Sequence, residues 1–255
     1  MNKRYLVTGA AGFIGSQVCL RLLEEGHLVS GVDNLNDYYD VRLKDWRLSQ
    51  IQSHPNSENF HFEKMDIENQ RSLDCFFGSN GPFDAVLNLA ARAGVSYSLE
   101  NPHVYLSTNA EGTLNLLECM RETGCKKFVY ASTSSLYAGQ KMPFTEELAV
   151  NEPLSPYAAS KKAGELIAYS YHKLYQVDVS VFVTSRCLDL PVAQTCLPTD
   201  SSNGLPKKKP FKCLGMVLNP EILLMSVTLP GEPLPPFRMW AMRSSIWAVE
   251  ETQFL

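Results

Sequence analysis

The sequence predicts an α/β fold with a doubly wound, parallel sheet of the Rossmann type over residues 1–182. Three observations predict this fold. Strand-like apolar runs alternate with helical runs, a glycine-rich turn joins the first strand to the first helix, and hydroxyl residues follow a later strand. A chain of 255 residues can form one large α/β domain, alone or with a small appendage.

The first strand is expected at residues 3–8. It runs into a turn with three glycines, Gly9, Gly12 and Gly15, and then into a helix at 13–25. Glycines at such a turn let the backbone approach a pyrophosphate, whose charge the first helical N–H groups hold. The alternative is a glycine-rich turn without a ligand.

The second strand, at 27–32, ends in Asp33, eighteen residues after Gly15. An acid at this place accepts hydrogen bonds from an adenosine ribose and disfavours a 2′-phosphate. The sequence therefore favours NAD over NADP as the cofactor.

The remaining elements continue the alternation. Strands are expected at 59–65, 84–90, 127–132 and 178–183, and helices at 38–53, 69–77, 103–123 and 156–175. The strand at 127–132 ends in four consecutive hydroxyl residues, 132–135. Hydroxyls at the carboxyl end of a parallel strand lie where ligands bind in open α/β sheets. The alternative is a polar turn that caps the next element.

Tyr157 and Lys161 stand four residues apart in the helix expected at 156–175, so they share one face of it. A lysine held beside a tyrosine stabilises the phenolate and lowers a phenol pKa that is otherwise about 10. The pair is therefore predicted to act as a proton acceptor at neutral pH. The alternative is an amphipathic helix with an exposed tyrosine and lysine.

Together these motifs resemble the extended short-chain dehydrogenase/reductase family of sugar-nucleotide epimerases and dehydratases. The resemblance rests on the glycine turn, Asp33-Asn34, Asp66-Ile67, Asn88-Leu89-Ala90-Ala91, Asn109, the hydroxyl run and Tyr157-x-x-x-Lys161. Within the family the chain is most similar to UDP-glucuronate 4-epimerases, through residues 33–44, 93–102 and 141–144. The resemblance covers residues 1 to about 182.

The resemblance implies catalytic roles for Tyr157, Lys161 and Thr133. It implies an NAD site that contains Gly9, Gly12, Phe13, Ile14, Gly15, Asp33, Asn34, Asp66, Ile67, Leu89, Ala90, Ala91, Asn109, Tyr157 and Lys161. It also implies contacts of Arg92, Ser134 and Ser135 with a nucleotide-sugar substrate of the UDP-hexuronate class.

The residues after Thr133 distinguish between reactions. Nucleotide-sugar 4,6-dehydratases carry an Asp-Glu pair there and UDP-glucuronate decarboxylases a Thr-Ser-Glu arrangement, whereas this chain carries Ser134 and Ser135. Inversion at C4 through a transient 4-keto sugar is therefore favoured over elimination. UDP-glucuronate, UDP-galactose and other hexoses remain open as substrates, as does reduction of a small carbonyl compound by a short-chain reductase.

Residues 183–255 differ from the preceding part. They contain 9 of the 15 prolines and none of the 11 tyrosines, with no sustained helical or strand period. Because a family-like segment can be read out of frame from 219–236, we expect a poorly ordered tail produced by a frameshift, in place of the substrate domain. The alternative is a divergent C-terminal module.

The tail would leave the strand at 178–183 as an unpaired sheet edge. The chain is then expected to be an impaired epimerase or a non-catalytic NAD-binding remnant of one.

Composition limits the partners. A net charge of −4, with one basic cluster at 207–209, argues against nucleic acid. No apolar run has membrane-spanning length, and the chain opens directly into a strand, so neither membrane association nor a signal peptide is expected. Seven cysteines without a C-x-x-C pair and five scattered histidines predict reduced thiols, a cytoplasmic location and no metal site. The helices at 103–123 and 156–175 resemble those through which relatives form homodimers; the alternative is ordinary packing.

Overall fold

The structure is a computed structural model that describes residues 2–141, 144–145, 148–184 and 224–227. Its strands are β1 (Arg4–Thr8), β2 (Leu28–Asp33), β3 (Phe60–Lys64), β4 (Ala85–Asn88), β5 (Lys127–Thr133), β6 (Asp178–Thr184) and β7 (Leu224–Val227). Its α-helices are α1 (Phe13–Glu24), α2 (Val41–Gln52), α3 (Gln70–Asn80), α4 (Val95–Glu100), α5 (Pro102–Leu106), α6 (Gly112–Thr123) and α7 (Pro156–Tyr175).

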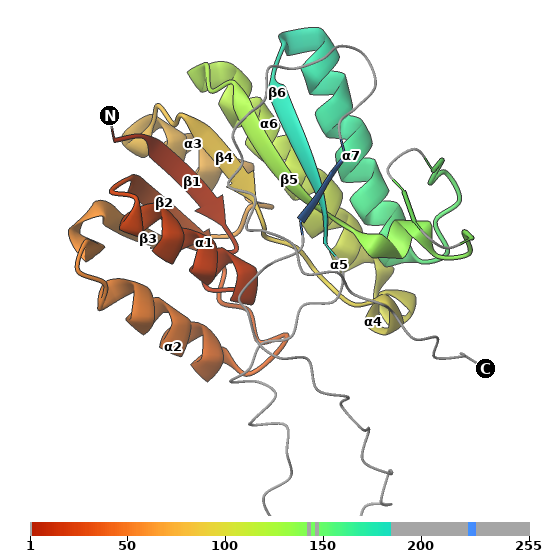
Figure 1. The fold of residues 1–255 in the computed structure, drawn as a ribbon, viewed down its shortest axis with the longest axis horizontal. Coiled ribbons are helices and arrows are strands. Elements are labelled where there is room, and N and C mark those ends of the chain that lie inside the picture. Colours follow the sequence, from red (N-terminus) through yellow and green to blue (C-terminus); the bar gives the residue numbers. More distant parts are fainter. Residues whose placement is uncertain (1, 142–143, 146–147, 185–223, 228–255) are drawn as a thin grey trace, which may run out of the picture.

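The strands form one sheet in the order β3-β2-β1-β4-β5-β6-β7, in which β1 to β6 are parallel (Figure 1). The order reverses its direction between β1 and β4, which is where open α/β sheets bind ligands. The predicted parallel, doubly wound fold is confirmed.

Helices cover both faces of the sheet, and each face has its own buried cluster. On one face, α1 and α2 pack together over a cluster that includes Val7, Leu23 and Ile51. On the other face, α3, α6 and α7 enclose a larger cluster with Phe77 and Phe128 at its centre. Figure 1 shows α1 in front of the sheet and α6 behind it.

Side-chain caps fix where several helices begin. Asp40 accepts a hydrogen bond from the Arg42 N–H at the start of α2 (3.0 Å), and Ser155 accepts one from the Ala158 N–H at the start of α7 (3.1 Å). Such caps satisfy N–H groups that have no partner inside the helix. The starts of α2 and α7 therefore follow from local sequence.

The single helix expected at 103–123 is in fact interrupted. It consists of α5, a π-helical turn at Ser107–Glu111, and α6. The short helix α4 before it was not predicted. π-helical turns are frequent at functional sites, and this one carries Asn109.

The prediction that residues 178–183 form an unpaired edge is wrong. β7 pairs antiparallel with β6, from Val181 opposite Val227 to Thr184 opposite Leu224. A free strand edge presents a row of unpaired N–H and C=O groups. The proline-free residues 224–227 pair with those groups of β6. The rest of the predicted tail, 185–223 and 228–255, lies outside the described residues.

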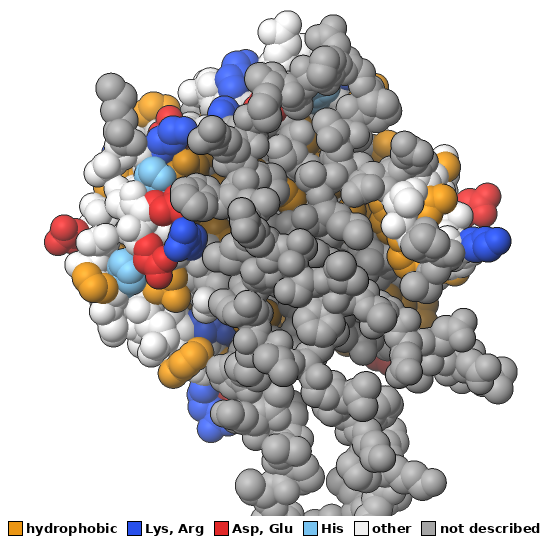
Figure 2. Space-filling model, viewed as in Figure 1, with side chains coloured by type: hydrophobic (Ala, Val, Ile, Leu, Met, Phe, Trp, Pro, Cys, Tyr) orange, Lys and Arg blue, Asp and Glu red, His pale blue; other side chains and the backbone are white. Residues whose placement is uncertain are grey.

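The described surface seen in Figure 2 carries acidic, basic and histidine side chains next to one another. Exposed ion pairs, such as Arg21–Glu24 at 3.0 Å, contribute little to stability. None of the helices formed by the described residues is long and apolar enough to cross a bilayer.

Candidate active site

A cleft of about 1060 Å³ lies at the carboxyl ends of the strands. Most of the predicted site residues line it: Gly9, Gly12, Phe13, Ile14, Gly15, Asp33, Asn34, Asp66, Ile67, Leu89, Ala90, Ala91, Arg92, Thr133, Ser134, Ser135 and Tyr157. Two predicted site residues, Asn109 and Lys161, are not among the residues that line it.

The glycine-rich turn packs closely against the end of β4. Gly9 has a φ of +68°, and a Cβ added to it would lie 2.9 Å from the Ala90 nitrogen. A Cβ on Gly15 would lie 2.0 Å from the Gly9 carbonyl oxygen. No side chain caps the start of α1, whose first residues line the cleft. The turn therefore has the features that hold a pyrophosphate: close backbone approach and a helix N-terminus without a side-chain cap.

A buried hydrogen-bond network supports this turn from behind. The Thr8 hydroxyl donates to the Asn88 side-chain oxygen (2.8 Å) and accepts from the Leu89 and Ala90 N–H groups (3.1 Å each). Asn88 in turn donates to the Thr113 hydroxyl (3.0 Å). The network joins the ends of β1 and β4 at the point where the strand order reverses.

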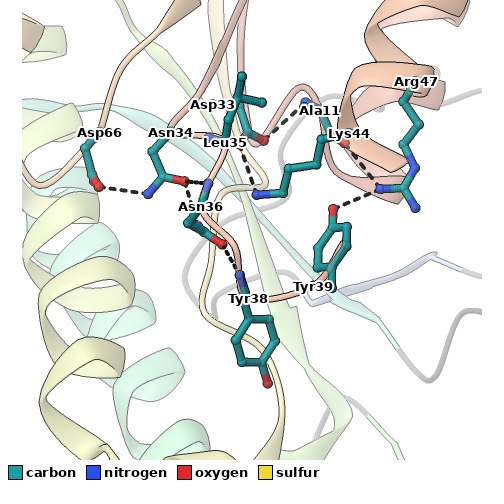
Figure 3. Close-up of polar contacts among 10 residues, drawn as sticks. All are labelled: Ala11, Asp33, Asn34, Leu35, Asn36, Tyr38, Tyr39, Lys44, Arg47 and Asp66. Atoms are coloured by element: carbon teal, nitrogen blue, oxygen red, sulfur yellow. Dashed lines mark hydrogen bonds and ion pairs between the residues drawn. The ribbon is translucent and has the colours of Figure 1, made fainter. Parts of the chain in front are cut away.

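Asp33 has protein partners on both oxygens. They accept hydrogen bonds from the N–H groups of Ala11 (3.2 Å) and Leu35 (2.8 Å), and the Lys44 ammonium lies 3.5 Å away (Figure 3). Asp33 and Lys44 are both buried. Charged groups are seldom fully buried unless they are paired, as these two are.

Lys44 and Arg47 line the cleft but were not predicted as site residues. Both face the Tyr39 ring, and Arg47 donates to the Tyr39 hydroxyl (2.9 Å). A signal was present in the sequence: both cations lie on the helix face that also carries the buried Leu48 and Ile51. Figure 3 shows Lys44 reaching toward Asp33 at the end of β2 and Arg47 directed at Ala11 and the Tyr39 hydroxyl.

Tyr157 lies at the other end of the cleft, beside the end of β5. Thr133 lines the same part of the cleft, and its side-chain oxygen accepts a hydrogen bond from the Ser135 N–H (3.2 Å). Burial raises the pKa of the Tyr157 phenol, and the Thr133 side chain opposes this rise. The prediction that Lys161 lowers the pKa of Tyr157 is therefore wrong for this structure.

The Lys161 side chain is buried against β5. Its ammonium donates to the Ala131 carbonyl oxygen (2.9 Å) and lies 5.0 Å from the centre of the Tyr130 ring. Burial lowers the pKa of Lys161 to about 7, while the charge of Glu165 acts in the opposite direction. The ammonium is held by β5, and Lys161 is not among the groups that shift the pKa of Tyr157.

The Asn109 side chain is hydrogen-bonded to other protein groups and does not line the cleft. Its amide oxygen accepts from the Arg92 N–H (2.9 Å), and its amide nitrogen donates to the Arg92 carbonyl (3.1 Å) and to the Ser160 hydroxyl (2.9 Å). Asn109 therefore positions Arg92 in this structure, and its contact with a cofactor stays a prediction.

Arg92 does line the cleft, and its Nε is buried without a hydrogen-bond partner among the described residues. Buried polar groups nearly always have a partner, so this N–H fits an acceptor on a bound ligand. Among the described residues no group of three histidine, cysteine or acidic side chains is arranged to hold a metal ion.

Comparisons with known proteins agree with this geometry. The UDP-glucuronate 4-epimerase of Thermodesulfobacterium geofontis is 58% identical over 177 residues, which are 69% of this chain and 54% of that protein. The crystal structure of UDP-glucuronic acid 4-epimerase from Bacillus cereus with UDP-glucuronic acid and NAD is 33% identical. It superposes with a TM-score of 0.63 over 70% of this chain and 56% of that one.

A dehydratase is also similar. The dTDP-glucose 4,6-dehydratase DesIV from Streptomyces venezuelae, with NAD bound, is 32% identical, with a TM-score of 0.59 over 71% of this chain and 55% of its own. The chain spans about half the length of the curated relatives it matches.

The family model described as GDP-mannose 4,6 dehydratase matches residues 6–188, which include the glycine turn, Asp33, Thr133, Tyr157 and Lys161. The chain therefore belongs to this family of extended short-chain dehydrogenases/reductases.

Proposed function

We propose that the cleft binds NAD, with the pyrophosphate on the glycine turn, the adenosine ribose at Asp33 and the nicotinamide half toward Tyr157. The absence of side chains at Gly9, Gly12 and Gly15 and the uncapped start of α1 support the pyrophosphate position. Asn34, Asp66, Ile67 and Leu89–Ala91 then border the adenosine and nicotinamide ribose.

We propose that the reaction is inversion at C4 of a UDP-sugar, with UDP-glucuronate as the substrate. Tyr157 accepts the proton of the C4 hydroxyl, and Thr133 hydrogen-bonds the same oxygen and shares its developing charge. When bound, NAD would supply both the acceptor of the C4 hydride and its donor on return to the other face of the sugar, and the positive charge of its nicotinamide would favour an anionic Tyr157. Lys161 adds its partial charge beneath this site.

Arg92 and the two serines are proposed as substrate contacts. Ser134 and Ser135 line the cleft beside Thr133, and Arg92 brings a cation with a buried N–H that has no described protein partner. An anionic sugar nucleotide supplies acceptors for all three.

The observation that carries the proposal is that Thr133 and Tyr157 line one cleft in which positions 134 and 135 are serines. Water elimination needs an acid and a base at this place. Serines supply neither at neutral pH, so the epimerase relatives are better guides to the reaction than DesIV.

The test is an assay of C4 inversion with UDP-glucuronate, followed by NMR of the sugar. We expect UDP-galacturonate from the parent chain and none from Tyr157→Phe, which keeps the ring and removes the proton acceptor. A matched control is Tyr169→Phe on the same helix, away from the cleft residues. Loss of water from the sugar in place of inversion would contradict the proposal.

A second candidate is a non-catalytic remnant that binds NAD without turnover. It is favoured because the chain spans about half of its relatives, and remote substrate contacts supply much of the orientation for a reaction. NAD binding without detectable inversion supports this candidate, and detectable inversion excludes it. We also propose that residues 183–255 arise from a frameshift, which the gene sequence across codons 180–190 tests.

We further propose that a second copy of the chain docks on α6 and α7. The exposed leucines Leu114, Leu166 and Leu174 lie on these two packed helices. Analytical ultracentrifugation of the parent chain and of Leu166→Glu tests this: we expect a dimer and a monomer, respectively.

The free cysteines of the described part support a cytoplasmic location, which cell fractionation tests.

A further inference from the structure

The segment of residues 34–40, which joins β2 to α2, has a backbone held by its own side chains. Asp33, Asn34 and Asn36 each accept a hydrogen bond from the N–H two residues further on, at 2.8, 3.1 and 3.2 Å. Such Asx turns fix the local backbone. Leu35 adopts a φ of +52°, a conformation that non-glycine residues rarely adopt. The 34–40 segment is therefore a defined structure along the rim of the cleft.

The 34–40 segment is attached to two other strand ends. Near its start, the Asn34 amide donates to Asp66 (2.8 Å), just after β3. Near its end, the Tyr38 hydroxyl donates to the carbonyl of Ala93 (2.8 Å), in the loop after β4, and its ring lies 5.5 Å from the Tyr97 ring. Tyr38 and Ala93 both line the cleft, so this hydrogen bond joins its two sides.

The loop that contains Ala93 leaves room for the Tyr38 hydroxyl. Gly94 has a φ of +102°, and a Cβ added to it would lie 2.8 Å from the Tyr38 oxygen. Tyr105 donates to the same Ala93 carbonyl (3.0 Å), and its hydroxyl would lie 3.8 Å from that Cβ. The phenol of Tyr38 therefore reaches Ala93 because position 94 has no side chain.

The neighbouring tyrosine has a different partner. Figure 3 shows the Tyr39 ring directed at Arg47 on α2, while the Tyr38 ring points away from that helix. Of these two adjacent tyrosines, Tyr38 is the one that connects the two sides of the cleft.

We propose that Tyr38 is a positioning residue that holds the 34–40 segment against Ala93 and thereby slows release of the bound dinucleotide. This proposal rests on the proposed NAD site. The segment follows Asp33, the proposed ribose acceptor, and Tyr38 attaches it to the loop after Leu89–Ala91; both attachments line the cleft proposed to hold the dinucleotide. An epimerase regenerates its cofactor in every cycle, so slow release suits the proposed reaction.

The test compares Tyr38→Phe with the parent chain by stopped-flow displacement of NAD. The variant keeps the ring and removes one hydrogen bond. Because Tyr38 is 40% exposed, we expect the release rate to rise only about three- to tenfold, the range of a typical net hydrogen bond. The matched control is Tyr97→Phe, the ring partner, for which we expect less than a twofold change.

A second variant tests the same contact from the receiving side. Gly94→Ala places a methyl group against the Tyr38 hydroxyl and should also accelerate release. In a Tyr38→Phe background its added effect on release should be smaller, because the contact is already lost.

The outcomes separate the two proposals. NAD binding with the same release rate in parent and Tyr38→Phe overturns the role of Tyr38 and leaves the proposed function intact. A folded parent chain without NAD affinity overturns both. Equal acceleration by Tyr38→Phe and Tyr97→Phe also overturns the specific role of Tyr38, since it would indicate general loosening of the aromatic contact.

Discussion

Lys161 illustrates at the residue scale how burial and charge compete in this site. It lies four positions after Tyr157, and the sequence predicts an ammonium that stabilises a phenolate. The structure instead has the ammonium on the Ala131 carbonyl, with its pKa lowered to about 7. Spacing predicts the shared helix face correctly, but the degree of desolvation depends on β5 and cannot be read from spacing.

The low pKa of Lys161 predicts a pH dependence of stability. An unfolded lysine titrates near ~10.4, so between pH about 7 and ~10.4 the unfolded chain binds more protons than the folded chain. The free energy of unfolding contributed by this group therefore rises with pH across that window and is lowest below it. We expect Lys161→Met to be more stable than the parent at pH 7, by ~1–4 kcal/mol, with a smaller difference at pH 10.

Urea unfolding at both pH values measures this difference. Lys173→Met, an exposed position on the same helix, is the control and should change little. A Lys161→Met chain that is less stable than the parent at pH 7 would show that the Ala131 hydrogen bond outweighs the cost of burial.

Gly9 gives a second prediction at the residue scale. Gly9→Ala combines a positive φ with a Cβ 2.9 Å from the Ala90 nitrogen, so we expect backbone displacement and at least a tenfold loss of NAD affinity. Gly26→Ala has a similar φ (+76°) but no atom within 4 Å of the added Cβ. It should cost ~1–2 kcal/mol of stability and leave NAD affinity unchanged. Isothermal titration of both variants decides whether the close approach, and not the strain alone, matters.

At the scale of elements, the sequence predicts most of the fold because each strand ends in a recognisable turn or polar run. The predicted strands agree with β1 to β6 to within a few residues. The π-helical turn and α4 were missed because both depend on tertiary contacts, such as those of Asn109 with Arg92 and Ser160. β7 was missed because four residues are too few to show a period.

The start of α7 carries a prediction of its own. Ser155 caps this helix two residues before Tyr157. Ser155→Ala should lower the free energy of unfolding by ~1 kcal/mol, while Ser155→Asp should retain most of the stability because it keeps an acceptor at the cap. Guanidinium unfolding measures both, and equal stability of the parent and the alanine variant would exclude a role for the cap.

At the scale of the whole molecule, the cleft joins five strand ends, so its ligand should stabilise the fold as a unit. At a concentration of one hundred times its Kd, NAD should raise the free energy of unfolding by ~2.7 kcal/mol. NADP should give a smaller shift in thermal midpoint, because its 2′-phosphate would lie beside Asp33. Equal shifts at equal concentration would indicate that Lys44 neutralises Asp33 fully enough to admit the phosphate.

The sequence predicts which residues gather at the site better than it predicts their pKa values. The glycine turn, Asp33 and the hydroxyl run lie at strand ends, and parallel strands bring those ends to one edge of the sheet. Lys44, Arg47 and Tyr38 were missed as site residues because their positions depend on how α2 and the 34–40 segment return over the cleft.

The order of the elements along the chain has a consequence for biosynthesis. Every described residue that lines the cleft precedes residue 158. Since N-terminal regions fold first while a chain is being made, the cleft can form as soon as α7 leaves the ribosome tunnel. A nascent polypeptide could thus acquire its nucleotide before translation ends.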